Sequence, residues 1–548
     1  MFTEQATSVF PRRLQTLAHQ AFGNGVVEID RSRYAASFLA VAIVAYIIYQ
    51  TFIHPLAKFP GPVSARYVPY WRNTRYWRGT WHEDILDVHR RYGRVVRIAP
   101  NELSIVDGEA MKHLYGHGTS STKTQWYATW DPPIPDAVAF FSARDRKIHA
   151  FQRKRVSGAY AMSSILRYEQ FIQQSLDELL LKFAKYATAD NKVDLAKWTN
   201  AFAFDVVGQL GFGAPLGHVK TESDVMNLRR IIFDMFYMSA GMGHYYWGIK
   251  GYYWGQMKIF TNKFTTSLLE LLGQKNDIVE FNVWGVARVK SRMDAEKRGE
   301  KGRPDMLAHF LNMKRADGSP AKFNEVLAEA LNLVGAGADT TSIAMRACVH
   351  AICLRPQVYR RLQAEIDDYY VANDLKSGIT YHQTQSLPYL VAVCKEAMRL
   401  LPSIVFQLLR HVPAEGMYVG KHYIPGGSEV GISPMAQNRD QDIWGPDADD
   451  FRPERWLESE ERTRFLDSYN MTFGGNGPRM CVGKNIALVE VHKFVAQLFH
   501  HFDVQVSNPD KPWHITTYWF AYQHDFYCNI TARPEFPLLA NEVPSEEQ

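Results

Sequence analysis

One cysteine-containing stretch, residues 473–483 (FGGNGPRMCVG), constrains this chain more than any other feature. It places Cys481 directly before a segment whose apolar spacing predicts a helix over 484–499. A helix N-terminus favours negative charge on sulfur, so such a cysteine can serve as a thiolate metal ligand. The surrounding glycines let a flat macrocycle approach the backbone, and Arg479 can pair with a carboxylate. A lone cysteine is otherwise a small buried hydrophobe, and this setting decides against that interpretation.

The bulk composition excludes several classes of protein. The 548 residues are 46% hydrophobic and 22% charged, which is typical of a globular protein rather than a disordered or polytopic membrane protein. A formal net charge of +5 argues against a general nucleic-acid binder, although a local basic patch could dock an acidic protein. The five cysteines lack CxxC spacing and are odd in number, which argues against a zinc site and a secreted disulfide framework.

Residues 34–53 form an uncharged apolar stretch near the start of the chain. At about 1.5 Å per residue this stretch just spans a bilayer core of roughly 30 Å, and it has neither the position nor the cleavage site of a signal peptide. A buried core helix is the alternative, but the Pro60-Gly61-Pro62 break that follows disfavours it. We therefore expect an N-terminal tail (1–33), a transmembrane anchor (34–53), a proline-containing hinge (54–66) and one large folded domain (67–548).

After the hinge the pattern is mainly helical. Apolar residues recur at helical spacing over 165–186 and 323–352, whereas short strand-like runs occur at 95–98 and 103–106. From residue 418 the chain is rich in Gly, Pro and Asp until the helix at 484–499, and its C-terminal stretch resembles strands. No internal repeat or long linker divides the chain after residue 60. The predicted fold class is mainly α (α+β), a single large helical domain with a minor β-sheet region.

A second motif, residues 336–341 (AGADTT), lies inside the predicted 323–352 helix. Glycine beside Asp and Thr in a helix interior lowers helix stability and favours a local bulge, which can open a groove for dioxygen and a water. A notch of small residues for close helix packing is an equally good interpretation of these residues taken alone.

A third motif combines Glu396 and Arg399, which lie on one helix face and can pair. An exposed pair of this kind contributes little stability. The segments 387–391 and 400–402 on either side are apolar, so we expect at least part of this pair to be buried. Arg455 follows later, within residues 451–456 (FRPERW).

Together these segments resemble the cytochrome P-450 superfamily, over roughly residues 60–535 and in the family's order. The 473–483 stretch resembles the family's cysteine loop, which makes Cys481 the axial ligand of a haem b iron. The 336–341 segment resembles the oxygen-activating helix, in which Thr340 would hold the activated oxygen and a water while Asp339 would feed a proton relay. The resemblance also implies a network that fixes the fold around the loop, formed by Glu396, Arg399 and Arg455.

The same resemblance assigns the remaining contacts. His149 and Arg153 resemble the family's Trp/His-x-x-x-Arg site for the haem carboxylates, and Arg410 resembles another carboxylate-binding position. The residues expected to bind the cofactor are His149, Arg153, Arg410, Arg479, Gly477, Gly483, Phe473, Ala336 and Gly337. Those expected to line the substrate pocket are Trp126, Phe140, Ala336, Ile404 and Val405. Aromatic residues over 233–254 favour an apolar, polycyclic or aromatic substrate, with ordinary core packing as the alternative.

Two positions depart from the family's pattern. The family's aromatic residue lies seven positions before the cysteine, where this chain has Gly474, with Phe473 one position further away. Either the Gly474-Gly475 pair absorbs the extra residue, or the loop is reshaped and the hydrogen bonding of the thiolate differs. Asn438 stands where the family usually has histidine, and we expect an effect on local packing only.

The resemblance implies a monooxygenase that inserts one atom of O2 into a hydrophobic small molecule by hydroxylation, demethylation or a related oxidation. Residues 94–106, 141–164 and 483–488 look most like the fungal pisatin demethylase-like group, which suggests secondary metabolism. Because no flavin- or NADPH-binding region is recognisable, electrons would come from an NADPH–haemoprotein reductase, with cytochrome b5 as a second donor. The basic residues expected to dock the donor are Arg146, Lys147, Arg153, Lys154, Arg155, Lys484 and Lys493.

The anchor and the resemblance together predict a protein of the endoplasmic reticulum membrane. Its single-pass anchor would contact membrane lipid, its catalytic domain would lie on the cytoplasmic face, and no nucleic-acid partner is expected. Two other functions stay open: a haem-thiolate isomerase or dehydratase that does not use O2, and a non-catalytic haem-binding protein.

Overall fold

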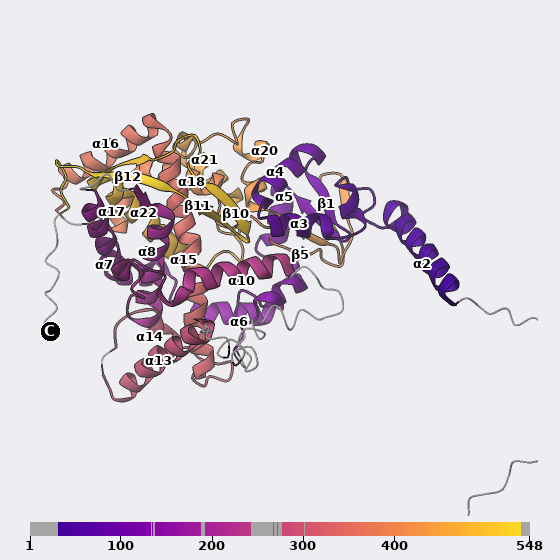
Figure 1. Cartoon of the computed structure of the whole chain (residues 1–548), viewed down its shortest axis with the longest axis horizontal. Helices are drawn as coiled ribbons and strands as arrows, with labels where there is room; N and C mark the ends of the chain where they lie inside the picture. The colour runs from indigo at the N-terminus through magenta and orange to yellow at the C-terminus, as the bar shows by residue number, and fades with distance from the viewer. Residues whose placement is uncertain are drawn as a thin grey trace, which may run out of the picture. The chain divides into compact units, whose positions relative to one another are not determined.

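The computed structural model describes residues 31–132, 134, 137–187, 192–242, 267, 271, 277–300, 302–376 and 378–538 (Figure 1). The chain divides into two compact units, Met1–Lys58 and Phe59–Gln548. In the first unit the described elements are helix α2 (Arg31–Ile48) and the π-helical turn η1 (Tyr49–Ile53). Residues 1–30 of the predicted tail lie outside the described part of the chain.

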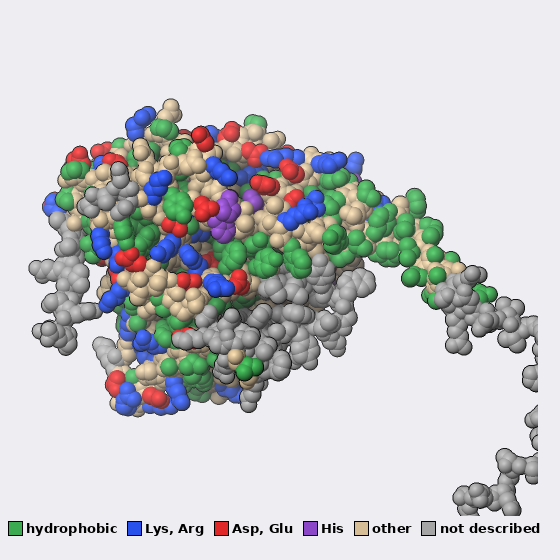
Figure 2. All heavy atoms as spheres, in the orientation of Figure 1, with side chains coloured by type: hydrophobic (Ala, Val, Ile, Leu, Met, Phe, Trp, Pro, Cys, Tyr) green, Lys and Arg blue, Asp and Glu red, His purple; other side chains and the backbone are tan. Residues whose placement is uncertain are grey.

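The helical segment Tyr34–Ile53 is 20 residues long and has a mean hydropathy of 2.0. Its apolar side chains bury little surface against protein, as Phe38 (77% exposed) and Val41 (68% exposed) show. Figure 2 shows hydrophobic side chains along this helix. The segment is long and apolar enough to cross a bilayer and is therefore a candidate membrane anchor.

Helices dominate the second unit. The longest, α15 (Phe323–Cys353), packs against α8 (Leu195–Phe212), α18 (Pro388–Leu400) and α22 (Lys484–His501). The other described helices of at least eight residues are α3 (Tyr70–Arg78), α4 (Trp81–Tyr92), α5 (Gly108–Tyr115), α6 (Arg146–Ser157), α7 (Met162–Tyr186), α10 (Leu228–Met242), α13 (Asp277–Lys297), α16 (Pro356–Ala372) and α21 (Glu460–Tyr469). Shorter helical segments include η2 (Val63–Arg66), η3 (Gln125–Trp130), α9 (His218–Thr221), α14 (Met306–Leu311), α17 (Tyr381–Thr384), α19 (Pro434–Gln437), α20 (Gln441–Trp444) and η5 (Pro453–Trp456).

Small sheets complete the described part of this unit. The largest has the strand order β1-β2-β8-β5-β3, in which β2 and β8 are parallel and the other neighbours are antiparallel. The remaining sheets have the orders β4-β12-β9, β10-β11 and β6-β7. The strands are β1 (Val95–Ala99), β2 (Glu102–Ile105), β3 (Thr122–Lys123), β4 (Lys192–Asp194), β5 (Arg410–His411), β6 (Met417–Val419), β7 (His422–Ile424), β8 (Glu429–Gly431), β9 (Phe502–Val506), β10 (His514–Tyr518), β11 (Phe520–His524) and β12 (Tyr527–Ala532).

The structure confirms a mainly helical domain with a minor sheet region. The helices predicted over 165–186, 323–352 and 484–499 are present as α7, α15 and α22, with slightly wider bounds. The bulge predicted within 336–341 is wrong, because α15 passes through this segment without interruption. The second compact unit begins at Phe59, inside the predicted hinge, and Arg97 of β1 donates its backbone N–H to Pro60 O at 2.7 Å.

Glu396 is the centre of a buried ion network that joins α18 to η5. Arg399 donates to both Glu396 carboxylate oxygens, at 2.9 and 2.8 Å, and Arg455 donates to Oε1 at 2.9 Å. All three side chains are fully buried. Burial alone would raise the pKa of Glu396, but the hydrogen bonds and charges of the two arginines outweigh it and hold this pKa below its usual value. The network therefore carries a true carboxylate.

Asn438 connects this network to the start of the cysteine loop. Its Nδ2 donates to Arg399 O (3.2 Å) and Thr472 Oγ1 (3.3 Å), while its Oδ1 accepts the backbone N–H of Met471 (2.8 Å). The side-chain amide of Asn438 therefore ties α18 to Met471 and Thr472.

Replacing the carboxylate in Glu396→Gln leaves the buried guanidinium group of Arg399 without a counter-charge and leaves Arg455 paired with Asp447 alone (3.3 Å). We expect the free energy of unfolding to fall by about 3–5 kcal/mol, as for other broken buried ion pairs. Urea unfolding followed by tryptophan fluorescence measures the change. The matched control is Glu454→Gln, which removes a pair with Arg361 in which both side chains are about half exposed, and it should cost less than about 1 kcal/mol. Equal losses in the two variants would contradict the structural role of Glu396.

Candidate functional site

Cys481 lies at the end of the glycine-rich loop, just before α22. Its backbone N–H donates to Phe473 O at 2.8 Å. Cys481 is exposed as a residue, yet burial is the largest influence on the pKa of its thiol and raises it. The exposure of the residue and the effect of burial on its pKa agree if protein encloses the sulfur and the sulfur faces an internal space. Backbone N–H groups of Gly483 and Lys484, together with the nearby charge of Arg153, favour the thiolate and oppose the effect of burial.

The glycines of this loop meet two different requirements. Gly474 and Gly475 both have φ of +82°, a left-handed conformation that side chains rarely adopt. This pair lets the chain turn while Phe473 O accepts the Cys481 N–H at 2.8 Å. At Gly477 the requirement is space, because a Cβ atom would lie 1.6 Å from Tyr115 O. The loop is therefore fitted closely against the end of α5.

On α15, Ala336 is exposed although Val334 and Ala338, two residues away on either side, are buried, which indicates that this point of the helix also borders an internal space. One turn later, Thr340 Oγ1 donates to Ala336 O at 2.7 Å, and Ser403 Oγ donates to Thr340 O at 2.7 Å. Gly337 instead packs against α8, where a Cβ atom would lie 2.8 Å from Val207. The packing-notch interpretation thus applies to Gly337, whereas Ala336 has exposed surface.

The Asp339 carboxylate is buried away from the Thr340 hydroxyl. Asn200 Nδ2 of α8 donates to Oδ1 at 2.6 Å, and the Tyr522 hydroxyl of β11 donates to Oδ2 at 3.2 Å. Burial raises the pKa of Asp339, partly offset by the Asn200 hydrogen bond and the charge of Arg346. The Asp339 carboxylate therefore belongs to a polar network that α15 shares with α8 and β11. Among the described contacts, no hydrogen bond joins this carboxylate to Thr340 Oγ1.

Five basic side chains lie close together, and we call them the cationic cluster: Lys123, His149, Arg153, Arg410 and Arg479. Burial and the surrounding cations lower the pKa of His149 to about 3 and that of Arg479 to about 10. Within the described residues, no member of the cluster forms an ion pair with a carboxylate; the nearby Arg144 does pair with Asp131 (3.0 Å).

The cluster members bond mainly to neutral oxygen atoms. Arg479 donates to Ala143 O at 2.8 Å, and Arg410 donates to Leu409 O at 2.8 Å and to the Tyr127 hydroxyl at 3.3 Å. Mutual repulsion of buried cations is unfavourable unless an anion is present. A ligand with several carboxylate oxygens fits this cluster. Sequence reasoning missed Lys123, since a two-residue strand gives no periodic signal.

Of the predicted pocket residues, only Ala336 and Ile404 have appreciable accessible surface; Trp126, Phe140 and Val405 are buried. Trp126 packs against Trp519 (ring centroids 5.0 Å apart) at the turn between β10 and β11. The backbone N–H of Val405 donates to Trp519 O at 3.3 Å. Trp519, which sequence reasoning missed, thus joins the 404–405 segment to the aromatic residues of η3. Most of the predicted aromatic segment 233–254 lies outside the described residues.

The predicted set of basic residues that dock an electron donor is wrong at two positions. Arg155 is buried and pairs with Glu325 of α15 at 2.7 Å. Lys493 is buried and pairs with Glu169 of α7 at 2.6 Å. Neither side chain can contribute to a surface, whereas Arg146, Lys147 and Lys154 of α6 are exposed.

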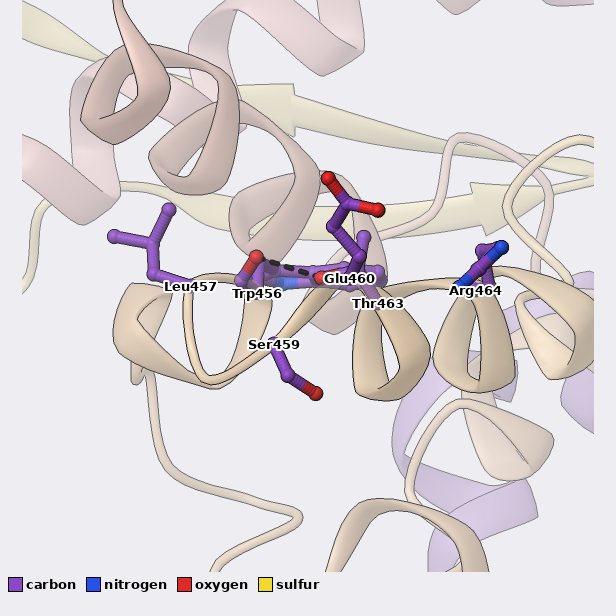
Figure 3. A pocket seen from close by; sticks show the side chains of 6 residues that line it. All are labelled: Trp456, Leu457, Ser459, Glu460, Thr463 and Arg464. Carbon is purple, nitrogen blue, oxygen red and sulfur yellow. Dashed lines mark hydrogen bonds between the residues drawn. The ribbon is translucent and has the colours of Figure 1, made fainter.

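A surface hollow of about 480 Å³ is lined by residues of η5, of α21 and of the turn between them (Figure 3). Its lining includes Trp456, whose indole N–H donates to Glu396 at 2.9 Å, and Thr463, whose hydroxyl donates to Trp456 O at 2.8 Å. Because it contains no member of the cysteine loop, the cationic cluster or α15, we do not assign the chemistry to it.

Comparison with known proteins agrees with the site. The cytochrome P-450 family model matches residues 60–524. The chain is 31% identical over 506 residues to cytochrome P-450 monooxygenase cicH of Emericella nidulans, covering 90% of this chain and 97% of that protein. It is 30% identical over 516 residues to pisatin demethylase of Fusarium vanettenii, covering 91% and 96%.

The chain belongs to the cytochrome P-450 family. It is a haem monooxygenase that uses O2, a small-molecule substrate and a redox partner. The resemblance found in the sequence is thereby confirmed, and the isomerase and non-catalytic alternatives are not favoured. The residues fit a haem group, because a reachable thiol and a cluster of cations without carboxylates match its iron and its two carboxylates.

Gly477→Ala should abolish haem incorporation, because its Cβ would overlap the Tyr115 backbone and displace the cysteine loop. Gly474→Ala is the matched control, since its Cβ meets nothing closer than 3.7 Å and only its positive φ is unfavourable, at a cost of about 1–3 kcal/mol. Haem content per folded protein measures both variants. Normal haem content in Gly477→Ala would contradict the close fit of this loop.

Proposed function

We propose that this protein is a membrane-anchored haem-thiolate monooxygenase of fungal secondary metabolism, with Cys481 as the axial ligand of the haem iron. The observation that carries this proposal is the Cys481 thiol, which is reachable although enclosed and receives backbone N–H groups at the start of α22. The division into tail (1–33), anchor (34–53), hinge (54–66) and catalytic domain (67–548) belongs to the same proposal.

Several residues would hold the haem. Cys481 would bind the iron, and the cationic cluster would bind the haem carboxylates with charge-assisted hydrogen bonds. Phe473, Gly477, Gly483, Ala336 and Gly337 would shape the faces on either side. When bound, haem with a thiolate ligand supplies the activation of O2. The chain supplies position, exclusion of water and protons.

Thr340 and Asp339 would divide the handling of protons. Thr340 lies one turn from the exposed Ala336, so its hydroxyl can exchange the bond to Ala336 O for a bond to a water. Burial raises the pKa of Asp339, which is held by Asn200 and Tyr522, so its carboxylate binds a proton more readily than an ordinary aspartate does. A water would have to bridge the two side chains.

Electrons would come from an NADPH–haemoprotein reductase, with cytochrome b5 as a further donor. Exposed Arg146, Lys147 and Lys154 on α6 support a basic docking surface for an acidic partner. The apolar helix Tyr34–Ile53 supports anchoring in the endoplasmic reticulum membrane, with the catalytic domain on the cytoplasmic face.

The substrate would be an apolar aromatic or polycyclic molecule, and its oxidation a hydroxylation, demethylation or related reaction. Support comes from the aromatic residues next to the pocket segment 404–405, which include Trp126 and Trp519. The similarity to pisatin demethylase supports demethylation among these reactions.

Thr340→Ala should uncouple reductase-driven oxygen consumption from product formation, because the hydroxyl that controls protons is lost. With membranes containing the reductase, NADPH and isotopically labelled O2, wild type should place the label in an apolar product. We expect the variant to form about tenfold less product per O2 consumed, in line with the size of general acid–base effects. Thr341→Ala, which alters the buried neighbour, should stay coupled. Unchanged coupling in Thr340→Ala would contradict the role of this hydroxyl.

A further inference from the structure

His218 of α9 lies between two carboxylates, one facing each nitrogen of its ring. Its Nδ1 lies 3.7 Å from Asp205 of α8, and its Nε2 lies 3.6 Å from Asp224 in the segment that leads into α10. The ring stacks on Phe204 of α8, with 4.8 Å between the ring centroids. Only 3% of the His218 side chain is exposed, so water screens these charges little.

This arrangement fits the doubly protonated ring. A neutral imidazole has one N–H, so its other nitrogen would present a lone pair to a carboxylate. The imidazolium form instead presents a positive N–H to Asp205 and to Asp224. Burial alone would lower the pKa of His218, but the two carboxylates outweigh burial and hold this pKa above its usual value.

Each of the two carboxylates also holds backbone N–H groups. Asp205 accepts those of the consecutive residues 217–219, at 2.6, 3.0 and 2.9 Å. Asp224 accepts those of residues 229–230 in the first turn of α10, at 2.9 and 3.1 Å. His218 therefore bridges two carboxylates that bind the ends of one segment, and this bridge joins α8 to the start of α10.

The segment between α9 and α10 has an unfavourable backbone conformation. Glu222, Met226 and Asn227 are all left-handed, with φ of 56°, 54° and 52°. Residues other than glycine rarely adopt this conformation, which persists only where surrounding contacts enforce it. Asp224 lies between these residues in the sequence, so loss of its pair with His218 favours a rearrangement of the segment and a shift of α10.

α10 in turn packs against the aromatic residues next to the proposed substrate pocket. Its Phe236 lies 4.9 Å from Trp130 of η3 and 4.2 Å from Phe520 of β11, measured between ring centroids. Trp130 also packs against Trp126 and Trp519. The position of the first turn of α10 therefore affects a wall of this aromatic region.

We propose that His218 is a pH-responsive latch of the substrate pocket: its imidazolium form ties the first turn of α10 to α8, and loss of its proton to solvent releases that turn. The latch consists of Asp205, His218 and Asp224. Its effect on a substrate rests on the proposed function, whereas the release of α10 does not. The other charged groups on the elements packed around the latch are Glu178 and Lys182 of α7, Lys220 of α9, Glu222, and Arg229 and Arg230 of α10.

The direction of the pH dependence follows from linkage. A histidine whose pKa is raised in the latched state adds stability that is complete below its ordinary pKa of about 6.5. This stability is lost as the pH rises through the raised pKa. Between these two values the equilibrium constant for release rises about tenfold per pH unit, because one proton leaves as the latch opens.

Hydrogen exchange of the full-length protein between about pH 6 and pH 9 measures this release. Rates are expressed as protection factors, which removes the intrinsic pH dependence of exchange. Residues 217–230 report on the latch, and α7 is the internal reference. His218→Gln removes the charge and keeps a polar side chain, so the titration of the surrounding groups is common to this variant and wild type. His117→Gln removes an exposed imidazole and is the matched control.

Two further measurements complete the experiment. Asp224→Asn removes one carboxylate but keeps an oxygen that can accept an N–H of α10, so it tests the latch even where His218→Gln does not fold. The association rate of 1-phenylimidazole with the haem iron, followed by the shift of the Soret band, reports on access to the pocket.

We expect the protection of residues 217–230 in wild type and His117→Gln to fall about tenfold per pH unit above about pH 6.5, while that of α7 stays constant. In His218→Gln these residues should be less protected at about pH 6 and should show no such fall. Asp224→Asn should narrow the pH range of the fall. The association rate of 1-phenylimidazole should rise with pH in wild type and His117→Gln but not in His218→Gln.

Constant protection of residues 217–230 in wild type, or an equal fall in His218→Gln, would overturn the latch. An unchanged pH range in Asp224→Asn would overturn the part played by that carboxylate. If exchange shows release but the association rate of 1-phenylimidazole does not follow the pH, the effect on the pocket is overturned. Absence of haem from all the proteins would instead contradict the proposed function.

Discussion

The Glu396 carboxylate is the charge on which the cysteine-loop side of the domain depends. It accepts hydrogen bonds from Arg399, Arg455 and the Trp456 indole, all buried where water cannot replace a lost partner. Arg399 O in turn accepts from Asn438, which accepts the backbone N–H of Met471. A short series of backbone bonds then leads from Met471 O to Gly474 and from Phe473 O to Cys481. The thiol is therefore positioned by neutral hydrogen bonds that are anchored on one buried ion network.

The opposite constraint operates at the cationic cluster, where buried positive charge has no counter-charge among the described residues. In the Glu396 network each arginine has a carboxylate partner within the protein, since Arg399 and Arg455 pair with Glu396 and Arg455 also pairs with Asp447 (3.3 Å), so the network stabilises the fold whether or not a ligand is present. The cationic cluster is incomplete and gains its counter-charge only from a ligand. This difference separates residues that build the site from residues that bind its cofactor.

Sequence reasoning succeeded where the determining contacts are local. Helical periodicity gave α7, α15 and α22, and three-residue spacing placed Glu396 beside Arg399. It failed where partners come from distant segments: the ion pairs of Arg155 with Glu325 and of Lys493 with Glu169 remove two basic residues from the surface. It also did not predict that Asn200 and Tyr522 bond to Asp339. Lys123 was missed for the same reason, because its position depends on the pairing of β3 with β5. Arg455 was placed with Glu396 only through the family resemblance, because residues this far apart in sequence show no local pattern.

The central claim is that Cys481 binds the haem iron as a thiolate. Its most direct test is the absorption spectrum of the dithionite-reduced, carbon-monoxide-bound protein in a membrane fraction, beside a Cys481→Ala control. The account predicts a strongly red-shifted Soret band in wild type and its loss in the control. A folded wild-type protein that binds haem without the red-shifted band, or a control that keeps it, would contradict the assignment of Cys481.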